Sequence, residues 1–186
     1  MKAENLLIDE YGYIKLSDFG LSKQATESNT FCGTPEYLSP EMLQGTKHDK
    51  TTDWWAFGIL VYEMLAGIPP FYDENQSKMF KNILEGEIPW PDKKLHGFQI
   101  SKDAIDLVQK LLIRDRKQRL GAKSGYLEVL EHRFFKGVNT KKILERKYKA
   151  PYIPKKQDMP SVEADGQLLE SLLSETCEES KKGSLE

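Results

Sequence analysis

Two short stretches near the beginning of the chain have the patterns of β-strands. Residues 5–9 contain a short apolar run, residues 13–16 alternate between apolar and polar side chains, and Gly12 lies between the two stretches. Short runs of this kind on either side of a turn residue are typical of a β-hairpin. The pattern therefore predicts a hairpin at the start of the chain.

A longer apolar stretch over residues 52–66 predicts a helix that is buried on nearly every side, because its apolar residues do not keep to one helical face. These residues are Trp54, Trp55, Phe57, Ile59, Leu60, Val61, Tyr62, Met64 and Leu65. Thr51 or Thr52 is expected to cap the beginning of the helix, and Gly67 with the prolines after it is expected to end it.

Two amphipathic helices and a short one are predicted further along the chain, over residues 77–84, 101–112 and 127–132. Ser101 is a suitable cap for the second of them. Its apolar positions are Ile105, Val108, Leu111 and Leu112. The chain after residue 50 is thus expected to be mainly helical.

Length and composition allow one core or half of a larger two-lobed enzyme. The chain has 186 residues, of which 39% are hydrophobic and 30% charged, and its net charge is -2. This balance gives no general reason to expect a nucleic-acid partner. No apolar run is long enough for a membrane span, and the first residues do not form an apolar signal region. We therefore expect a cytoplasmic protein.

The two cysteines, Cys32 and Cys177, are too few for a disulfide framework and lack the spacing of a zinc site. Both are expected to be reduced thiols.

Charge changes sign along the last fifty residues. Residues 136–156 hold eight lysines and arginines against one glutamate, a net charge of +7, whereas residues 157–186 hold eight acidic residues against two lysines, a net charge of -6. The segment Pro151-Tyr152-Ile153-Pro154 lies near the junction, and a solvated extended linker is one interpretation of it. The acidic end is expected to be largely disordered, apart from a small stripe of leucines over residues 168–173 that is a marginal helix or a weak partner site.

Several short motifs occur in order between the hairpin and the long helix. The tripeptide Asp18-Phe19-Gly20 follows the hairpin, where Asp18 could be a metal ligand and Gly20 could permit an unusual backbone angle. The run Thr30-Phe31-Cys32-Gly33-Thr34 comes next, and Ser39-Pro40-Glu41 ends the segment. Asn5 precedes these motifs and Asp53 follows them at the start of the long helix.

In this order the motifs resemble those of a serine/threonine protein kinase of the AGC group, the cyclic-nucleotide-regulated and lipid-regulated kinases. The resemblance implies an α+β fold, consisting of the mainly α-helical large (C-terminal) lobe of a kinase with a short β-hairpin at its start. The small N-terminal β-lobe is missing. Residues 1–135 would be a partial catalytic domain, and residues 136–186 a partly disordered AGC-type C-terminal tail.

The resemblance also assigns catalytic roles for the use of ATP and Mg²⁺. Asn5 and Asp18 would be the two magnesium ligands that flank the hairpin, since amide and carboxylate oxygens suit this ion. Lys2 would stabilise the transferring phosphate, and Thr34 would position the substrate hydroxyl. Taken alone, Asn5 and Asp18 could equally be a turn residue and a solvated acid.

Thr30 is the expected phosphorylation site of an upstream activating kinase, with Lys23 as the cation that pairs with the phosphate. The alternative is that the hydroxyls of this segment are ordinary solvated loop residues.

The resemblance further implies a substrate site for proteins with basic residues near the phosphoacceptor. Glu4, Glu36 and Glu63 would bind substrate arginines, because carboxylates and guanidinium groups match in two parallel hydrogen bonds. The residue after the phosphoacceptor would enter a pocket lined by Phe31, Pro35 and Leu38. Scattered surface acids are the alternative for the three glutamates.

Two further assignments are structural. Glu41 would form a buried ion pair with Arg119, whereas two exposed charges are the alternative. Asp53 would hold backbone amides of the catalytic loop, unless it is an ordinary first-turn aspartate stabilised by the helix dipole.

Some of the kinase machinery does not occur in these 186 residues. The catalytic aspartate belongs five positions before Asn5, and the Gly-rich phosphate loop, the strand lysine and its partner glutamate have no counterpart. The chain alone is therefore expected to be inactive. It would be either a fragment of an active kinase or a natural non-catalytic lobe that binds kinase partners or substrates.

Overall fold

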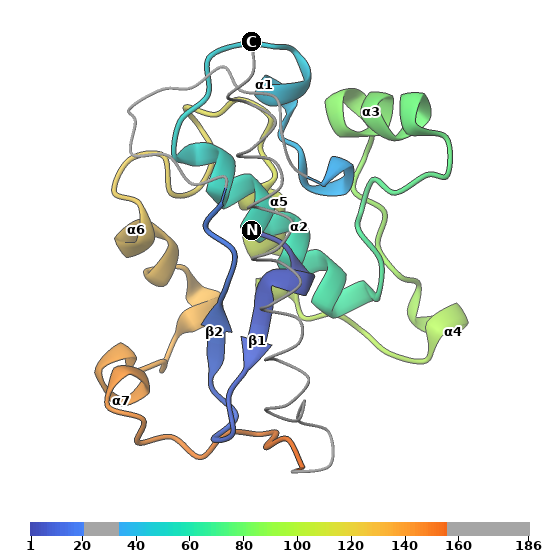
Figure 1. Ribbon diagram of the computed structural model, residues 1–186. Coiled ribbons are helices and arrows are strands. Elements are labelled where there is room, and N and C mark those ends of the chain that lie inside the picture. Colours follow the sequence, from blue (N-terminus) through green and yellow to red (C-terminus); the bar gives the residue numbers. More distant parts are fainter. Residues whose placement is uncertain (21–33, 156–186) are drawn as a thin grey trace, which may run out of the picture. The chain divides into compact units, whose positions relative to one another are not determined.

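The computed structural model describes residues 1–20 and 34–155 (Figure 1). The chain divides into two compact units. The first unit consists of Met1–Leu6 and Leu16–Lys147. The second combines Leu7–Lys15 with the residues from Tyr148 onward. The predicted fold class is confirmed, because the described residues form a mainly helical assembly and one two-stranded sheet.

The predicted hairpin is present as β1 (Leu6–Ile8) and β2 (Ile14–Leu16). Its turn is held by Asp9, whose carboxylate accepts the Tyr13 amide at 2.8 Å and the Tyr11 amide at 3.1 Å. Gly12 has a φ of +83°, and its amide donates to the Asp9 carbonyl. A glycine is required at this turn, since the left-handed region strains other residues.

The second unit joins this turn to a segment from the far end of the chain. The Tyr13 hydroxyl donates to the Tyr148 carbonyl at 2.7 Å. A Cβ atom on Gly12 would lie 2.1 Å from the carbonyl oxygen of Tyr152, so the two backbones approach more closely than any side chain permits.

Helix α2 (Thr51–Ala66) is the long apolar helix, and most of its side chains lie in the hydrophobic core. Met64 and Asp53 are exceptions to the prediction of a helix buried on nearly every side, since Met64 is 63% exposed and Asp53 is also exposed. Gly67 ends the helix in the left-handed conformation, and its amide donates to the Glu63 carbonyl.

The start of α2 also differs from the prediction. Neither Thr51 nor Thr52 is the cap, because the helix begins at Thr51 itself and Lys50 precedes it without a side-chain cap. Asp49 supplies the missing acceptor instead. Its Oδ1 atom accepts the Thr51 amide at 2.8 Å and the Thr51 hydroxyl at 2.6 Å.

Helix α5 (Lys102–Leu111) packs against α2 and completes the core. Ser101 caps it as predicted, with its hydroxyl accepting the Ala104 amide at 3.2 Å. The two helices touch at Gly58, where a Cβ atom would lie 2.8 Å from Leu112 and 2.9 Å from Leu111. Glycine therefore lets the helices approach each other closely.

Helix α3 (Gln76–Glu85) and the short helix α6 (Tyr126–Leu130) match the other two predictions, although α6 ends two residues earlier than expected. The remaining elements are too short to give a periodic signal. They are the 3-10 helices η1 (Ala3–Asn5), η2 (Pro35–Tyr37) and η3 (Arg133–Phe135), and the helices α1 (Pro40–Leu43), α4 (Lys93–His96) and α7 (Thr140–Leu144).

Arg114 ties the end of α3 to the segment after α5. Its Nε atom donates to the Ile83 carbonyl at 2.9 Å, and its Nη2 atom donates to the carbonyls of Asn82 and Gly86. The guanidinium also lies over the Phe71 ring, 5.7 Å from its centroid. One cation thus binds three carbonyls at and just after the end of α3.

Within the part of the chain that the structure describes, no helix combines the length and the apolar character needed to cross a membrane.

The contact at Gly58 leads to a stability prediction. Alanine would improve the helix propensity by about 1 kcal/mol but would also overpack the α2–α5 contact, so we expect Gly58→Ala to lower the free energy of unfolding by a net ~1–2 kcal/mol. Urea unfolding measures this. Met64→Ala is the control at an exposed position of the same helix and should change stability by less than about 0.5 kcal/mol. A stabilised Gly58→Ala protein would contradict the close approach.

Candidate functional site

Asn5 and Asp18 lie next to each other at the two ends of the hairpin. Asn5 ends η1, Asp18 follows β2, and the Asn5 Nδ2 atom is 3.4 Å from Asp18 Oδ2. The Ser17 amide and hydroxyl both bind the Asn5 carbonyl, at 2.8 Å and 3.1 Å. This backbone link holds the two side chains at one place.

The unusual backbone angle of this site is found at Asp18, with a φ of +57°, and not at Gly20 as predicted. The Asp18 Oδ1 atom accepts the Gly20 amide at 3.1 Å. A short side chain that binds its own backbone tolerates the left-handed region better than most, which explains why an aspartate can adopt it. Gly20 serves instead as the donor that orients the carboxylate.

The donor set at Asn5 and Asp18 fits a magnesium ion. Amide and carboxylate oxygens are the ligands that Mg²⁺ prefers, and this ion usually takes only one or two protein ligands while waters and phosphates complete its shell. Among the described residues no cluster of three or more histidine, cysteine, aspartate or glutamate side chains could hold a metal ion. The two expected ligands thus lie side by side, and their metal role stays a prediction.

Lys2 and Thr34 occupy equivalent places, each directly before one of the 3-10 helices. Lys2 immediately precedes η1 with an extended backbone, and Thr34 immediately precedes η2, where its carbonyl accepts the Tyr37 amide at 3.0 Å. Both are half-buried.

Tyr37 connects the residues of η1 with α2. Its hydroxyl accepts the Ala3 amide at 3.2 Å and donates to a carboxylate oxygen of Glu63. Only 8% of Tyr37 is exposed, and burial together with the hydrogen bond to Glu63 raises the pKa of its hydroxyl well above the ordinary value. The negative charge of Glu4 acts in the same direction, so two of the three expected substrate-binding acids surround this tyrosine.

The other expected substrate residues have different environments. Glu36 lies in η2 and is half-buried, as is Pro35. Leu38 is only 4% exposed and belongs to the core, so its side chain packs inside the protein in this structure. Phe31, Thr30 and Lys23, for which a pocket and a phosphorylation switch are expected, lie outside the described residues.

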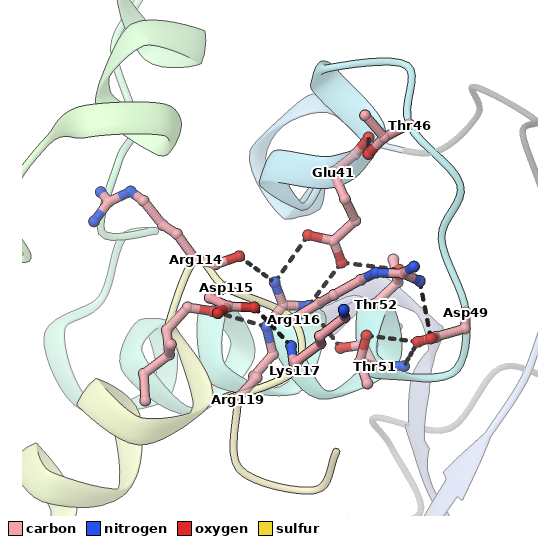
Figure 2. A network of polar contacts seen from close by, with 11 residues as sticks. Glu41, Thr46, Asp49, Thr51, Thr52, Arg114, Asp115, Arg116, Lys117 and Arg119 are labelled. Atoms are coloured by element: carbon pink, nitrogen blue, oxygen red, sulfur yellow. Dashed lines mark hydrogen bonds and ion pairs between the residues drawn. The ribbon is translucent and has the colours of Figure 1, made fainter.

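Glu41 and Arg119 form a buried ion pair with two parallel hydrogen bonds (Figure 2). The Arg119 Nη1 atom is 2.7 Å from Glu41 Oε1, and Nη2 is 2.8 Å from Oε2. Arg119 is completely buried and Glu41 is 5% exposed. The structure therefore brings together two charges that are 78 positions apart in sequence.

The remaining donors of Arg119 are also satisfied. Its Nε atom binds the Ile113 carbonyl at 2.9 Å, Nη1 binds the Thr51 carbonyl at 2.9 Å, and Nη2 is 3.3 Å from the Arg114 carbonyl. The guanidinium lies 5.1 Å from the centre of the Trp55 ring. A buried charge is stable only when its hydrogen bonds are made in this way.

The protonation of Glu41 reflects its partner. Burial by itself would raise the pKa of this carboxyl, but the hydrogen bonds and the charge of Arg119 outweigh burial and lower the pKa below its usual value. Thr52 adds a hydroxyl donor at 3.2 Å. Glu41 is thus ionised at neutral pH.

Two features of this region were not foreseen from the sequence. Asp49 pairs with Arg116 at 2.9 Å in addition to holding the start of α2, and Tyr37 bridges Ala3 and Glu63. An aspartate two positions before a threonine is a recognisable sequence signal for the role of Asp49 at the start of α2. The Tyr37 bridge has no such signal, because it depends on long-range packing.

Asp53, which was expected to hold backbone amides of the catalytic loop, lies exposed in the first turn of α2.

Comparison with known proteins identifies the class to which this fold and site belong. The protein kinase domain family matches residues 1–135, so the chain belongs to this family. Its relatives are serine/threonine kinases of the AGC type.

Three relatives illustrate the similarity. The chain is 48% identical over 159 residues to a cAMP-dependent protein kinase catalytic subunit of Dictyostelium discoideum. The match covers 84% of this chain and 24% of that protein. It is 44% identical over 157 residues to the mouse cAMP-dependent protein kinase catalytic subunit PRKX, covering 83% of this chain and 42% of the relative. It is also 44% identical over 158 residues to rat serine/threonine-protein kinase Sgk1. This match covers 83% of this chain and 35% of the relative. The chain thus spans less than half the length of each of these relatives.

The buried pair leads to a prediction about stability. Arg119→Ala should lower the free energy of unfolding by about 3–5 kcal/mol, because the Glu41 carboxylate would remain buried without its partner. The control is Arg133→Ala, which removes an arginine whose side chain is 58% exposed and whose ion pairs with Asp103 and Asp106 lie at the surface. It should cost about 1 kcal/mol or less. Equal losses in urea unfolding would show that burial does not set the strength of the Glu41 pair.

Proposed function

We propose that these residues form the metal-holding and substrate-holding part of a protein kinase that transfers the γ-phosphoryl group of ATP to serine or threonine in basic sequence contexts. The observation that carries the proposal is the juxtaposition of Asn5 and Asp18 in a segment that matches the kinase family. Both are oxygen ligands, and they flank a hairpin that fixes their separation.

In this proposal the side chains of Asn5 and Asp18 would hold Mg²⁺, and the phosphates of ATP would supply further ligands to the same ion. When bound, the ion neutralises charge that develops on the phosphates during transfer. Asp18 is held for this task by the Gly20 amide, and Asn5 by its backbone link to Ser17. The ammonium group of Lys2 adds positive charge near the phosphate, and Thr34 positions the substrate hydroxyl.

Glu4, Glu36 and Glu63 provide the negative charge that selects basic substrates. Support comes from Tyr37, whose hydroxyl donates to Glu63 and whose pKa is raised in part by the charges of Glu63 and Glu4. Two carboxylates near one tyrosine favour a guanidinium group as a partner, because it can bind them through several parallel hydrogen bonds. Phe31 and Pro35 complete the proposed pocket for the next substrate residue.

We infer that Thr30 is the site of an activating phosphorylation and that Lys23 pairs with the phosphate. The support is the position of Thr30 before Phe31, Cys32, Gly33 and Thr34 in the sequence. A cytosolic location is likewise a proposal, and it rests on the ordinary composition of the chain.

The 186 residues alone are proposed to be catalytically inactive. They contain no Gly-rich phosphate loop and no aspartate five positions before Asn5 to accept the proton of the substrate hydroxyl. A second function, binding of kinase partners or substrates without catalysis, is favoured by the buried Glu41–Arg119 pair, whose two parallel hydrogen bonds stabilise the helical unit.

A transfer assay tests this statement about activity. The purified chain, incubated with radiolabelled ATP, Mg²⁺ and a serine peptide containing two arginines, should incorporate no label above the level without protein. A complete AGC kinase domain in the same assay is the positive control. Incorporation that Asp18→Asn abolishes would show that these residues suffice for catalysis.

The metal site is tested with Mn²⁺, whose binding can be followed by water-proton relaxation. Asp18→Asn keeps an acceptor for the Gly20 amide but removes the charge, so we expect Mn²⁺ to bind about tenfold more weakly. Glu131→Gln is the matched control, because it removes an exposed carboxylate elsewhere and should leave Mn²⁺ binding unchanged. An equal effect of both substitutions would remove the metal role of Asp18.

Recognition of basic substrates is tested with the same arginine peptide, labelled with a fluorophore, in anisotropy titrations. Glu63→Gln and Glu4→Gln should each weaken binding about tenfold, since each loses a charge-assisted hydrogen-bond acceptor. Glu131→Gln should bind the peptide as the unaltered chain does. Binding that does not depend on Glu4 or Glu63 would exclude this site.

A further inference from the structure

Residues 136–147, named the α7 face, form a basic surface around helix α7 (orange in Figure 1). Every residue of this stretch is exposed, and α7 itself contains no buried residue. The stretch holds five lysines and arginines against one glutamate, a net charge of +4. Its apolar side chains are exposed as well, since Leu144 is 84%, Val138 45% and Ile143 41% exposed.

A helix as short as α7 is not stable by itself. It has five residues, and isolated helices shorter than about 12–15 residues are marginal in water. Asn139 caps its start by accepting the Lys142 amide at 3.0 Å, but a cap contributes only about 1 kcal/mol. Helices in proteins gain most of their stability by packing an apolar face, and α7 has no such packing within the part of the chain that the structure describes. A partner that covers Ile143 and Leu144 would supply it.

The charges of the α7 face are only partly balanced. Glu145 lies 2.7 Å from Lys147 and 4.0 Å from Lys141, so one carboxylate serves two cations. The two lysine side chains are 64% and 83% exposed, and ion pairs at such exposure contribute about 1 kcal/mol or less. The face therefore suits a partner that carries several negative charges together with apolar side chains.

The same chain contains a segment with these properties. Residues 157–186, named the acidic tail, carry a net charge of -6, opposite in sign to the α7 face. Four leucines of the acidic tail have a spacing that brings apolar side chains to one side of a helix, at positions 168, 169, 172 and 173. Glu170 lies between these leucines, and Glu175 follows them.

The acidic tail is long enough to reach back to the α7 face. Twenty-three residues separate Leu144 from Leu168. A flexible chain of this length has a typical end-to-end distance of about 25–30 Å. A covalent connection of this kind gives an effective concentration on the order of millimolar. A weak attraction is then enough to keep the tail bound.

We propose that the acidic tail docks on the α7 face of the same chain, with its carboxylates near Lys141 and Lys142 and its leucines against Ile143 and Leu144. The contact balances the charge of the face and gives α7 the apolar packing that it needs. This docking is independent of the proposed phosphoryl transfer. An anionic membrane and the acidic tail of a second copy are the competing occupants.

The test uses the 186-residue chain with a nitroxide spin label on Cys177, in a Cys32→Ser background so that one thiol reacts. The label broadens the resonances of nearby amide protons, and the reduced label is the reference. We expect broadening over residues 140–147 and none in α4. The broadening should fall at least about threefold when NaCl is raised from about 0.05 M to about 0.5 M, because salt screens exposed charges.

Charge reversal tests the contact from both sides. Lys141→Glu combined with Lys142→Glu should lower the ratio of docked to free tail about tenfold, since two attractions become two repulsions. Glutamates near the start of a helix are favourable, so this variant does not act by unfolding α7. Adding Glu170→Lys and Glu175→Lys to it should restore most of the broadening.

The matched control is Lys93→Glu combined with Lys94→Glu. These are also two adjacent, exposed lysines near the start of a short helix, α4, and their reversal should leave the broadening of α7 unchanged. If the Lys141 and Lys142 variant is unfolded, Glu170→Lys with Glu175→Lys alone decides, because it leaves the described residues unaltered. It should show the same tenfold loss.

Three results would overturn the proposal. The first is that α7 is not broadened, or that the control and the Lys141 and Lys142 variant have equal effects. The second is that spin-labelled chain broadens α7 of a separate, isotope-labelled chain as strongly as its own, which makes a second copy the occupant. The third is that α7 is not broadened while reversal of Lys141 and Lys142 weakens sedimentation with phosphatidylserine vesicles, which makes the face a membrane site.

Discussion

The buried pair of Glu41 and Arg119 is the interaction on which the helical unit depends most. It joins α1 to the segment after α5, and the same guanidinium binds the first carbonyl of α2 and lies over Trp55. These contacts meet where the long helix begins, so the charge is surrounded by backbone that it helps to hold in place. Removing two ions from water is costly, and complete hydrogen bonding is what makes the arrangement stable. The pair is therefore a fixed point for three parts of the chain.

A second polar connection lies further along α2 and has a different character. Tyr37 joins η1 to Glu63 through one hydroxyl, near the charge of Glu4 and at the edge of the core. Arg119 uses all its donors within the protein, whereas Glu63 keeps acceptor positions for another molecule. One end of α2 thus carries closed polar contacts that suit stability, and the other carries open ones that suit binding. Both are held by the same apolar helix, whose core contacts with α5 prevent it from shifting.

Sequence patterns were sufficient for the elements whose signal is local. The hairpin, α2, α3 and α5 follow from periodicity, and the Ser101 cap follows from its place before a helical run. The cap of α2 was assigned wrongly because two threonines at a helix start look like caps, while the acceptor came from Asp49. The left-handed angle was expected at Gly20 and occurs at Asp18, since the side chain of an aspartate can bind its own backbone. The Tyr37 link could not be predicted, because it depends on how η1, η2 and α2 pack.

The close contact at Gly12 has a consequence for the order in which the chain folds. The hairpin turn belongs to a unit whose other part begins at Tyr148, and the Tyr13 hydroxyl finds its acceptor 135 positions away. During synthesis the hairpin is made before the helices α1 to α7, whereas its partner is made only after them. Contacts between such distant segments form slowly, because a long loop must close before they contribute. The second unit is therefore completed only after the residues of the helical unit have been made.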